Sequence, residues 1–235
     1  MKGAFPALSQ MRDEGVIQAW GIGVNTPEPI LRVMQESDPD MCLLASQYSL
    51  IDHANALNNV FPVARQRDVS FVVGSSLNAG FISGSSRYNY GKNNWNISQE
   101  HLAKRDRLRA VANQFGVDLR TAALQFSAAP DVVVSLIVGA HTEAQALANA
   151  SSMKVTIPQD FWAELKRQNL IEQNAPVPEG GAYPRLRCVV DLQSLALVSL
   201  TLSPCSISVR NLRMTAATQR SESASAQPKS RAACL

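Results

Sequence analysis

The chain has 235 residues, of which 46% are hydrophobic and 17% are charged. This mixture is ordinary for a globular protein, and it excludes a collagen, a coiled coil, a small disulfide scaffold and a disordered acidic tail. The formal net charge of +3 is unevenly spread, because residues 1–179 carry 15 basic and 17 acidic side chains while residues 180–235 carry 7 and 2. Since the positive balance belongs to the last part alone, we expect no nucleic-acid partner.

The cysteines and apolar stretches give no sign of a metal site, a disulfide framework or a membrane segment. No two cysteines have the short spacing that presents two thiolates to zinc, and no histidine stands at ligand spacing beside them. The N-terminus does not resemble a signal peptide, and the longest apolar stretch, 195–202, is far shorter than the ~20 residues that a membrane helix needs. We therefore expect a cytoplasmic protein with free thiols, no metal and no membrane partner. The cysteines are Cys42, Cys188, Cys205 and Cys234.

Four short runs of Val, Ile and Leu predict strands at 16–24, 41–45, 69–74 and 132–139. They are almost continuously apolar, as expected of parallel strands that are buried on both faces. Apolar residues at helical spacing lie between them, and the order is helix, then strand–helix four times, with a doubled helix before the last strand. This alternation predicts a parallel α/β sheet with right-handed crossovers. The helical patterns run over 57–64, 108–115 and 119–126.

Residues at the expected helix ends agree with this order. Gly15 and Gly116 stand where a left-handed residue would end a helix. Asp118 can cap the next helix, and Thr142 with Gln145 has the spacing of a capping box. Pro158 suits the first turn of a final helix.

The segment 80–97 interrupts the pattern. It is rich in Gly, Ser, Asn and Tyr and shows no helical period. Two interpretations stay open, a mobile lid over a ligand and a disordered surface insertion.

Ligands of parallel α/β proteins lie beyond the carboxyl ends of the strands. Here those ends carry Gly, Ser, Asn and Gln, which suit close backbone approach to a phosphate or a planar ring. For proton transfer the candidates are few, and a lone His or Tyr is more often structural than catalytic. No strand end offers a base, an acid and an orienting partner together, so we nominate no catalytic residue. The candidates considered are Tyr48, His53, Tyr88, His101 and His141.

Residues 1–177 resemble the C-terminal half of an aldo-keto reductase, especially the branch with D-threo-aldose 1-dehydrogenase and pyridoxal 4-dehydrogenase. The resemblance is carried, in order and spacing, by LSQMRDEGVIQAWGIGVN, LLASQYSLIDH, VVGSSLNAGFISG, FGVDLRTAALQFSAAPDVVVSLIVGAHTEAQALAN and APVP. It implies a parallel (β/α)8 TIM barrel, here incomplete, with strands five to eight and their helices over 1–178. It also implies an NAD or NADP cofactor and a small aldose or aldehyde substrate.

The same resemblance implies the cofactor contacts. Gly23 and Asn25 would lie near the nicotinamide, and Gln145 and Asn149 near the adenosine, where a helix N-terminus favours a phosphate. The loop 75–80 would lie near the pyrophosphate, through Ser75, Ser76, Leu77, Asn78 and Gly80, and Gly139 and His141 complete the set at the last strand end.

This sequence departs from the family pattern at several of these positions. Where the family often has Arg or Lys to pair a 2′-phosphate, it has His141 and Gln145, so NAD is at least as compatible as NADP. Ala45 replaces a common Gln and Gly74 an aromatic residue, as in the aldose-dehydrogenase branch. No residue matches the family's catalytic Asp, Tyr, Lys and His on strands two to four, so we expect this chain alone to be inactive.

Half a barrel would leave two strand edges and one face of the sheet open. We therefore expect self-association through these edges. Residues 179–235 match nothing in the family and show no sustained helix or strand period, which predicts an irregular, disordered basic tail. Two interpretations of this tail stay open, a frameshifted extension and a basic appendage for anionic partners. Two functions also stay open for the chain as a whole, an NAD(P)-dependent oxidoreductase and a non-catalytic remnant or cofactor-binding module.

Overall fold

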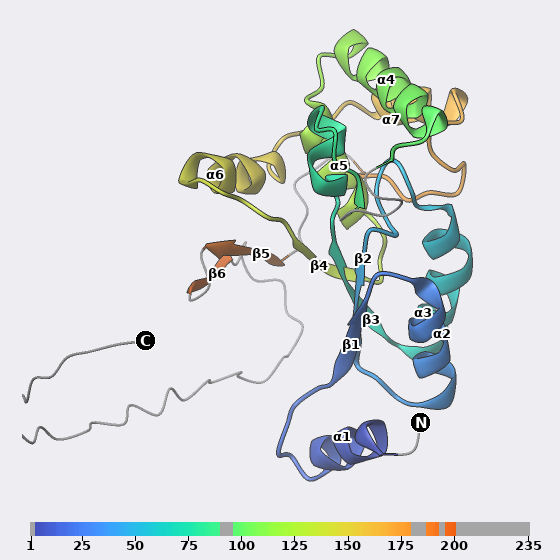
Figure 1. The fold of residues 1–235 in the computed structure, drawn as a ribbon, viewed down its shortest axis with the longest axis vertical. Coiled ribbons are helices and arrows are strands. Elements are labelled where there is room, and N and C mark those ends of the chain that lie inside the picture. Colours follow the sequence, from blue (N-terminus) through green and yellow to red (C-terminus); the bar gives the residue numbers. More distant parts are fainter. Residues whose placement is uncertain (1–2, 90–95, 180–186, 193–195, 201–235) are drawn as a thin grey trace, which may run out of the picture. The chain divides into compact units, whose positions relative to one another are not determined.

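The computed structural model describes residues 3–89, 96–179, 187–192 and 196–200, the last two ranges by their backbone alone. They all belong to one compact unit, residues 1–204. At its centre four parallel strands pair in chain order (Figure 1). They confirm the four predicted runs, although the first begins later than expected. The strands are β1 (Gly21–Val24), β2 (Met41–Ala45), β3 (Ser70–Gly74) and β4 (Val133–Ile137).

The helices follow the predicted order. One helix precedes β1, between one and three follow each of the four parallel strands, and the doubled helix α4 and α5 stands before β4. In Figure 1, α2 and α3 lie on one side of the sheet, while α4 and α7 lie together near its far end. The helices are α1 (Ala4–Asp13), α2 (Pro27–Glu36), the π-helix η1 (Ala56–Val60), α3 (Phe61–Arg67), the 3-10 helix η2 (Asn78–Ser83), α4 (Gln99–Gln114), α5 (Leu119–Ala128), α6 (Glu143–Ser152) and α7 (Gln159–Arg167).

The predicted helix ends are confirmed. Gly15 and Gly116 have positive φ angles of 72° and 63°. The Asp118 side chain accepts a hydrogen bond from the backbone N–H of Thr121 at the start of α5. Thr142 accepts one from the N–H of Gln145 at the start of α6. Each cap satisfies a backbone donor that the first helical turn leaves without a partner.

The core lies between the sheet and the helices α3, α5 and α7. Tyr48 stacks on Phe126 with ring centroids 5.3 Å apart, and both rings are fully buried. Phe61 and Trp162 extend this aromatic cluster. Since the segment after β2 carries Tyr48 into this cluster, the core fixes the direction in which the chain leaves that strand.

The segment 80–97 is only partly irregular. Its first residues belong to η2, and Phe81, Ile82, Tyr88 and Asn89 are buried. The interpretation of a surface insertion is therefore wrong for residues 80–89, because four of their side chains pack into the molecule. Residues 90–95 lie outside the described residues.

The sequence predicts an irregular tail from residue 179, and the structure differs from this over two short segments. The structure places β5 (Arg187–Leu192) parallel to β4, and β6 (Ala196–Leu200) antiparallel to β5. Short Val- and Leu-rich segments can form strands here because the edge of β4 offers unpaired backbone N–H and C=O groups. The edge of β4 is therefore not open, contrary to expectation. The rest of the predicted tail lies outside the described residues.

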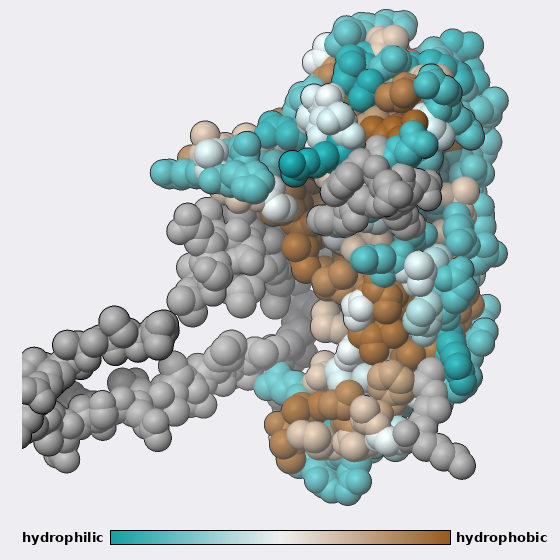
Figure 2. All heavy atoms as spheres, viewed as in Figure 1, coloured by the Kyte–Doolittle hydropathy of each residue, from teal (hydrophilic) through white to brown (hydrophobic). Residues whose placement is uncertain are grey.

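The side of the sheet away from α2 and α3 carries exposed apolar side chains. Met41, Val134 and Ile137 are 39%, 38% and 40% exposed although they belong to strands. Figure 2 shows hydrophobic residues gathered along the sheet on this side. Exposed apolar patches of this kind are typical of interaction surfaces, so this face is the part of the sheet most suited to contact further polypeptide.

Among the described residues, none of the helices has the length and apolar character needed to span a bilayer.

Candidate functional site

The carboxyl ends of β2 and β3 share an unusual backbone. Ser46 and Ser75, the residues that directly follow the two strands, have positive φ angles of 61° and 65°. The two ends are tied together, because the Ser46 N–H donates to the Gly74 carbonyl oxygen at 3.2 Å. A non-glycine residue in the left-handed region costs on the order of 1–3 kcal/mol, and such strain gathers at functional sites.

The loop after β3 also contains residues with strained backbone angles. Asn78, Ala79 and Gly80 all have positive φ angles, of 49°, 58° and 82°. The turn is closed by hydrogen bonds from the Asn78 N–H to the Ser75 carbonyl and from the Gly80 N–H to the Leu77 carbonyl. A left-handed residue beside one of negative φ, as Asn78 stands beside Leu77, can form part of a concave anion site. The assignment of the loop 75–80 to an anionic group stays a prediction.

Within the described part of the chain, four buried polar atoms at these strand ends have no hydrogen-bond partner. They are the hydroxyls of Ser46, Ser75 and Ser76 and the side-chain carbonyl of Asn78. Asn78 is otherwise fixed, since its amide donates to the Asn89 oxygen at 2.8 Å. A buried unsatisfied polar group costs about 1–3 kcal/mol, so these four are candidates for hydrogen bonds to a ligand, although Trp20, Tyr48 and Trp162 also carry such an atom elsewhere in the fold. We call these four residues the strand-end cradle.

The predicted residues beyond β4 lie at the next strand end. Gly139 and His141 are exposed. The Gln145 side-chain oxygen accepts from the His141 N–H at 2.8 Å, and the Asn149 amide donates to the Gly139 carbonyl at 3.4 Å. These bonds fasten the loop after β4 to the first turns of α6, whose N-terminus favours an anion nearby.

Gly23 and Asn25 lie farther along the sheet, because β2 separates β1 from β3. The Asn25 carbonyl accepts a hydrogen bond of 2.7 Å from the side chain of Gln47 at the end of β2. The structure thus brings Ser75–Gly80 and Gly139–Asn149 to adjacent strand ends and leaves Gly23 and Asn25 on the other side of β2. Ser46 was not predicted as a site residue, although it follows an apolar run just as Ser75 does.

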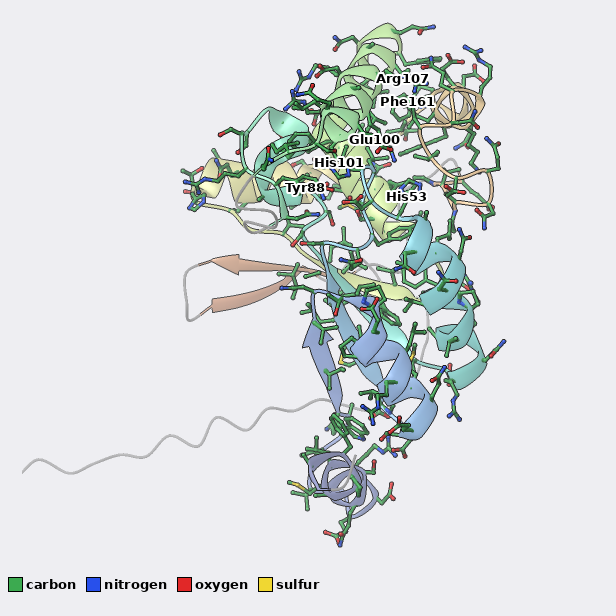
Figure 3. All side chains as sticks on the ribbon, turned by 45° about the vertical axis from the view of Figure 1, so that its right-hand side comes forward. His53, Tyr88, Glu100, His101, Arg107 and Phe161 are labelled. Atoms are coloured by element: carbon green, nitrogen blue, oxygen red, sulfur yellow. The ribbon has the colours of Figure 1, made fainter. Side chains whose placement is uncertain are left out.

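A cavity of about 410 Å³ opens beside the cradle, and sequence reasoning did not find it. Ser46 and Gln47 form one end of it, and the rest comes from the segment after β2, from α4 and from residues 169–172. Figure 3 shows His53, Tyr88 and His101 in this region. The Tyr88 hydroxyl donates to the Asp52 carboxylate, and His101 Nε2 lies 3.4 Å from the other oxygen of Asp52.

His53 is a structural residue, as the sequence analysis favours. Its Nε2 accepts from the Glu172 N–H at 3.1 Å, so Nδ1 carries the proton and donates to the Ser49 carbonyl at 2.9 Å. Both ring nitrogens are therefore used. Burial, helped by the nearby Lys104 charge, lowers the pKa of His53 to about 4.

This buried histidine predicts acid sensitivity. Its pKa is about 4 in the folded chain and 6.5 ordinarily, so the unfolded state binds more protons between these values. We expect stability to be full above pH 6.5 and to fall by about 2–3 kcal/mol as the pH drops toward 4. Urea unfolding at several pH values measures this. His53→Gln should flatten that part of the profile, whereas His141→Gln, at an exposed position, should not; equal slopes in both variants would contradict the assignment.

Tyr48 gives no sign of proton transfer. Its ring is enclosed by the aromatic core, and burial raises the pKa of its hydroxyl. No group of three or more His, Cys, Asp or Glu side chains within the described ranges is placed to hold a metal ion.

Parallel α/β sheets with such strand ends form a class of proteins whose ligands lie beyond the carboxyl ends of the strands. The chain matches the Aldo/keto reductase family over residues 1–169. It therefore belongs to this family, as the sequence resemblance predicts.

Two curated relatives are similar over 173 residues, 72% of this chain. Pyridoxal 4-dehydrogenase from Microbacterium luteolum is 30% identical, with 49% of its length covered. D-threo-aldose 1-dehydrogenase from a Pseudomonas species is 33% identical, with 51% covered. The chain thus spans about half the length of the curated relatives that it matches.

A solved structure agrees with the assignment of this chain to the family. Aldo-keto reductase AKR11C1 from Bacillus halodurans, in its holo form, is 25% identical with a TM-score of 0.54, over 74% of this chain and 57% of that one. The family match begins at residue 1 and gives no position within the family fold. The prediction of the C-terminal half, with strands five to eight, is therefore not borne out by the comparisons and stays a prediction.

Proposed function

We propose that this chain is the cofactor-binding part of an NAD(P)-dependent oxidoreductase that acts on an aldose or another aldehyde. The observation that carries the proposal is the strand-end cradle, with its four unsatisfied polar atoms beside a left-handed loop. Family membership supports the reaction class, and the names of the two curated relatives support an aldose or pyridoxal as substrate. The alternative of a non-catalytic remnant has no comparable support.

The residues present fit a dinucleotide. The left-handed loop 75–80 suits the pyrophosphate, and the hydroxyls of Ser46, Ser75 and Ser76 can hydrogen-bond to an amide or a phosphate oxygen. Gln145 and Asn149 would hold the adenosine end at the start of α6. His141 and Gln145 provide no fixed cation for a 2′-phosphate, which supports NAD at least as much as NADP. When bound, the nicotinamide supplies the hydride acceptor or donor.

The chain's own contribution is to bind and orient that cofactor. Of the side chains in the neighbouring cavity, the Tyr88 hydroxyl is committed to Asp52, and Tyr88 is buried between Phe81 and His101. A proton donor must instead reach the substrate oxygen within hydrogen-bond distance. We propose that this donor comes from strands outside the described sheet, and that the chain alone has no activity.

The exposed apolar face of the sheet also supports the proposal that strands outside the described sheet complete the site. In a closed barrel, the inward-facing side chains of all strands fill the interior in layers. In such a barrel Met41, Val134 and Ile137 would contact further strands or a second copy of the chain. The division into a barrel part at 1–178 and a separate tail, and the cytoplasmic location, stay predictions.

The proposal is tested by titrating the purified chain with NADH and NADPH and by assaying turnover. We expect saturable binding with a Kd on the order of 1–100 μM, and no oxidation of D-arabinose or pyridoxal with either cofactor. Absence of binding to both cofactors would overturn the cofactor site. Turnover by the chain alone would overturn the conclusion that its proton donor lies elsewhere.

A further inference from the structure

Asp52 is not a member of the strand-end cradle, yet hydrogen bonds connect it to the loop after β3. Its carboxylate oxygen Oδ2 accepts from the Asn89 side-chain amide at 3.3 Å. The Asn89 side-chain oxygen in turn accepts from the Asn78 amide at 2.8 Å. Both amides are buried, with Asn78 0% and Asn89 3% exposed. We call Asp52, Asn89 and Asn78 the amide relay, because they join the segment after β2 to the cradle.

The carboxylate gives the amide relay a direction. A carboxylate only accepts hydrogen bonds, whereas a side-chain amide accepts through its oxygen and donates through its NH2 group. Asn89 therefore turns its NH2 group toward Asp52 and its oxygen toward Asn78. Asn78 must then turn its own NH2 group toward Asn89, and its oxygen has no partner among the described residues. The relay thus makes Asn78 an acceptor, and not a donor, for a ligand of the cradle.

The Asp52 carboxylate is itself held from α4 and from the segment before it. The Tyr88 hydroxyl donates to the same oxygen as Asn89, and His101 Nε2 lies 3.4 Å from the other one. The rings of Tyr88 and His101 are in contact, with centroids 4.7 Å apart (Figure 3). One turn further along α4, the Lys104 ammonium donates to the carbonyl of the residue before Asp52 at 2.7 Å. The relay therefore begins at a carboxylate with a fixed position.

The amide relay also holds strained backbone. Asn78 and Asn89 both have positive φ angles, of 49° and 43°. Asn78 is followed by Ala79 and Gly80, which are left-handed as well. Such conformations persist in residues other than glycine only where the surrounding contacts impose them. A hydrogen bond between the two asparagine side chains is one such contact, so the relay supports the shape of the loop 75–80.

We propose that Asp52 is a positioning residue for the cofactor. Acting through Asn89, it holds the loop 75–80 in its binding conformation and turns the Asn78 oxygen to accept from a hydroxyl or N–H group of the dinucleotide. A phosphate oxygen, which only accepts, does not suit this atom. The inference rests on the proposed function, because that function assigns the cofactor to the cradle.

The first test compares NADH affinities by calorimetry. Asp52→Ala removes the carboxylate, and we expect about fivefold weaker binding, as for one hydrogen bond that is no longer oriented. Asp52→Asn should bind within about twofold of the parent, since the Tyr88 hydroxyl still requires an acceptor and keeps the new amide oxygen in place. Asp131→Ala is the matched control, because it removes a carboxylate that pairs with Arg65 at 2.7 Å, and it should bind as the parent does.

The second test uses the free chain and so does not depend on the cofactor. The side-chain amide protons of Asn78 and Asn89 are followed by NMR as they exchange with water. We expect slow exchange in the parent, in Asp52→Asn and in Asp131→Ala, and exchange about tenfold faster or more in Asp52→Ala, because the relay then has no fixed beginning. Equal rates in all four chains would show that Asp52 does not orient the two amides.

A shape-conserving variant replaces Asp52→Ala if that variant does not fold. In Asp52→Asn combined with Tyr88→Phe, neither residue fixes the direction of the new amide, so NADH affinity should fall about twofold or more. Tyr88→Phe alone should bind as the parent does, because the Asp52 carboxylate still only accepts.

The failures of the inference and of the proposed function can be told apart. Equal NADH affinity of the parent and a folded Asp52→Ala, or weak binding by Asp52→Asn, would overturn the inference and leave the cofactor site standing. Absence of NADH binding to the parent would overturn the proposed function and with it the cofactor role of Asp52. The exchange rates would still show whether Asp52 orients the amides.

Discussion

Replacing Gly21 by alanine is expected to destabilise the chain by about 3 kcal/mol or more. A Cβ atom at this position would lie 1.6 Å from the carbonyl oxygen of Met41, which is backbone in the neighbouring strand. The clash cannot be relieved by a side-chain rotation, so β1 and β2 would have to separate where they pair. Chemical denaturation followed by circular dichroism measures the loss.

Gly23 supplies the matched control for this change. It lies two residues along the same strand, and a Cβ there would stand 3.5 Å from the Leu43 Cβ, an ordinary contact distance. Gly23→Ala should therefore change the free energy of unfolding by less than about 1 kcal/mol. Equal effects of the two substitutions would show that β1 and β2 do not pair in the register Gly21 to Met41.

The double substitution Ser46→Ala and Ser76→Ala is expected to stabilise the free chain while weakening its cofactor binding. Both hydroxyls are buried without partners, and removing an unsatisfied buried hydroxyl should raise the free energy of unfolding by about 1 kcal/mol each. Thermal and urea unfolding without cofactor measure this. Such a trade between stability and binding is characteristic of functional sites.

A buried serine with a partner is the control for that experiment. The Ser127 hydroxyl donates to the Ala123 carbonyl at 2.9 Å. Ser127→Ala should destabilise the chain by about 1 kcal/mol because a hydrogen bond is lost. If the double variant loses stability in the same way, its hydroxyls have partners within the free chain, and the cradle is not the feature that the cofactor completes.

The elements of this fold could be predicted because their signals are local. The runs at 41–45 and 69–74 are rich in Val, Leu and other apolar residues although one face of each strand is only partly buried, and Asp118 and Thr142 cap the helices that they precede. The strands β5 and β6 could not be predicted from the sequence, because their pairing depends on the edge of β4, about 50 residues earlier in the chain. Strands set by a distant partner leave little periodicity of their own.

The site could be predicted only in outline. The rule that ligands lie beyond strand ends located Ser75, Ser76 and Asn78, and the family resemblance assigned them to the cofactor. The left-handed backbone of Ser46 and Ala79 has no sequence signal, since neither residue favours a positive φ angle. Tertiary packing imposes this left-handed backbone conformation on the two residues.

The cavity beside the cradle could not be predicted from the sequence for a different reason. Asp52, Tyr88 and Lys104 are far apart in the chain, and each is unremarkable in its own sequence surroundings. They meet because the segment after β2 and the first turns of α4 converge on one place (Figure 3). Such a meeting is a property of topology rather than of local pattern.

One calorimetric titration tests the central claim most directly, that the strand-end cradle holds the cofactor. NADH is titrated into the parent chain, the Ser46→Ala and Ser76→Ala double variant and Ser127→Ala. We predict saturable binding to the parent and to Ser127→Ala, and binding at least about tenfold weaker in the double variant, as expected for two lost hydrogen bonds. Unchanged NADH affinity in a folded double variant would contradict the claim.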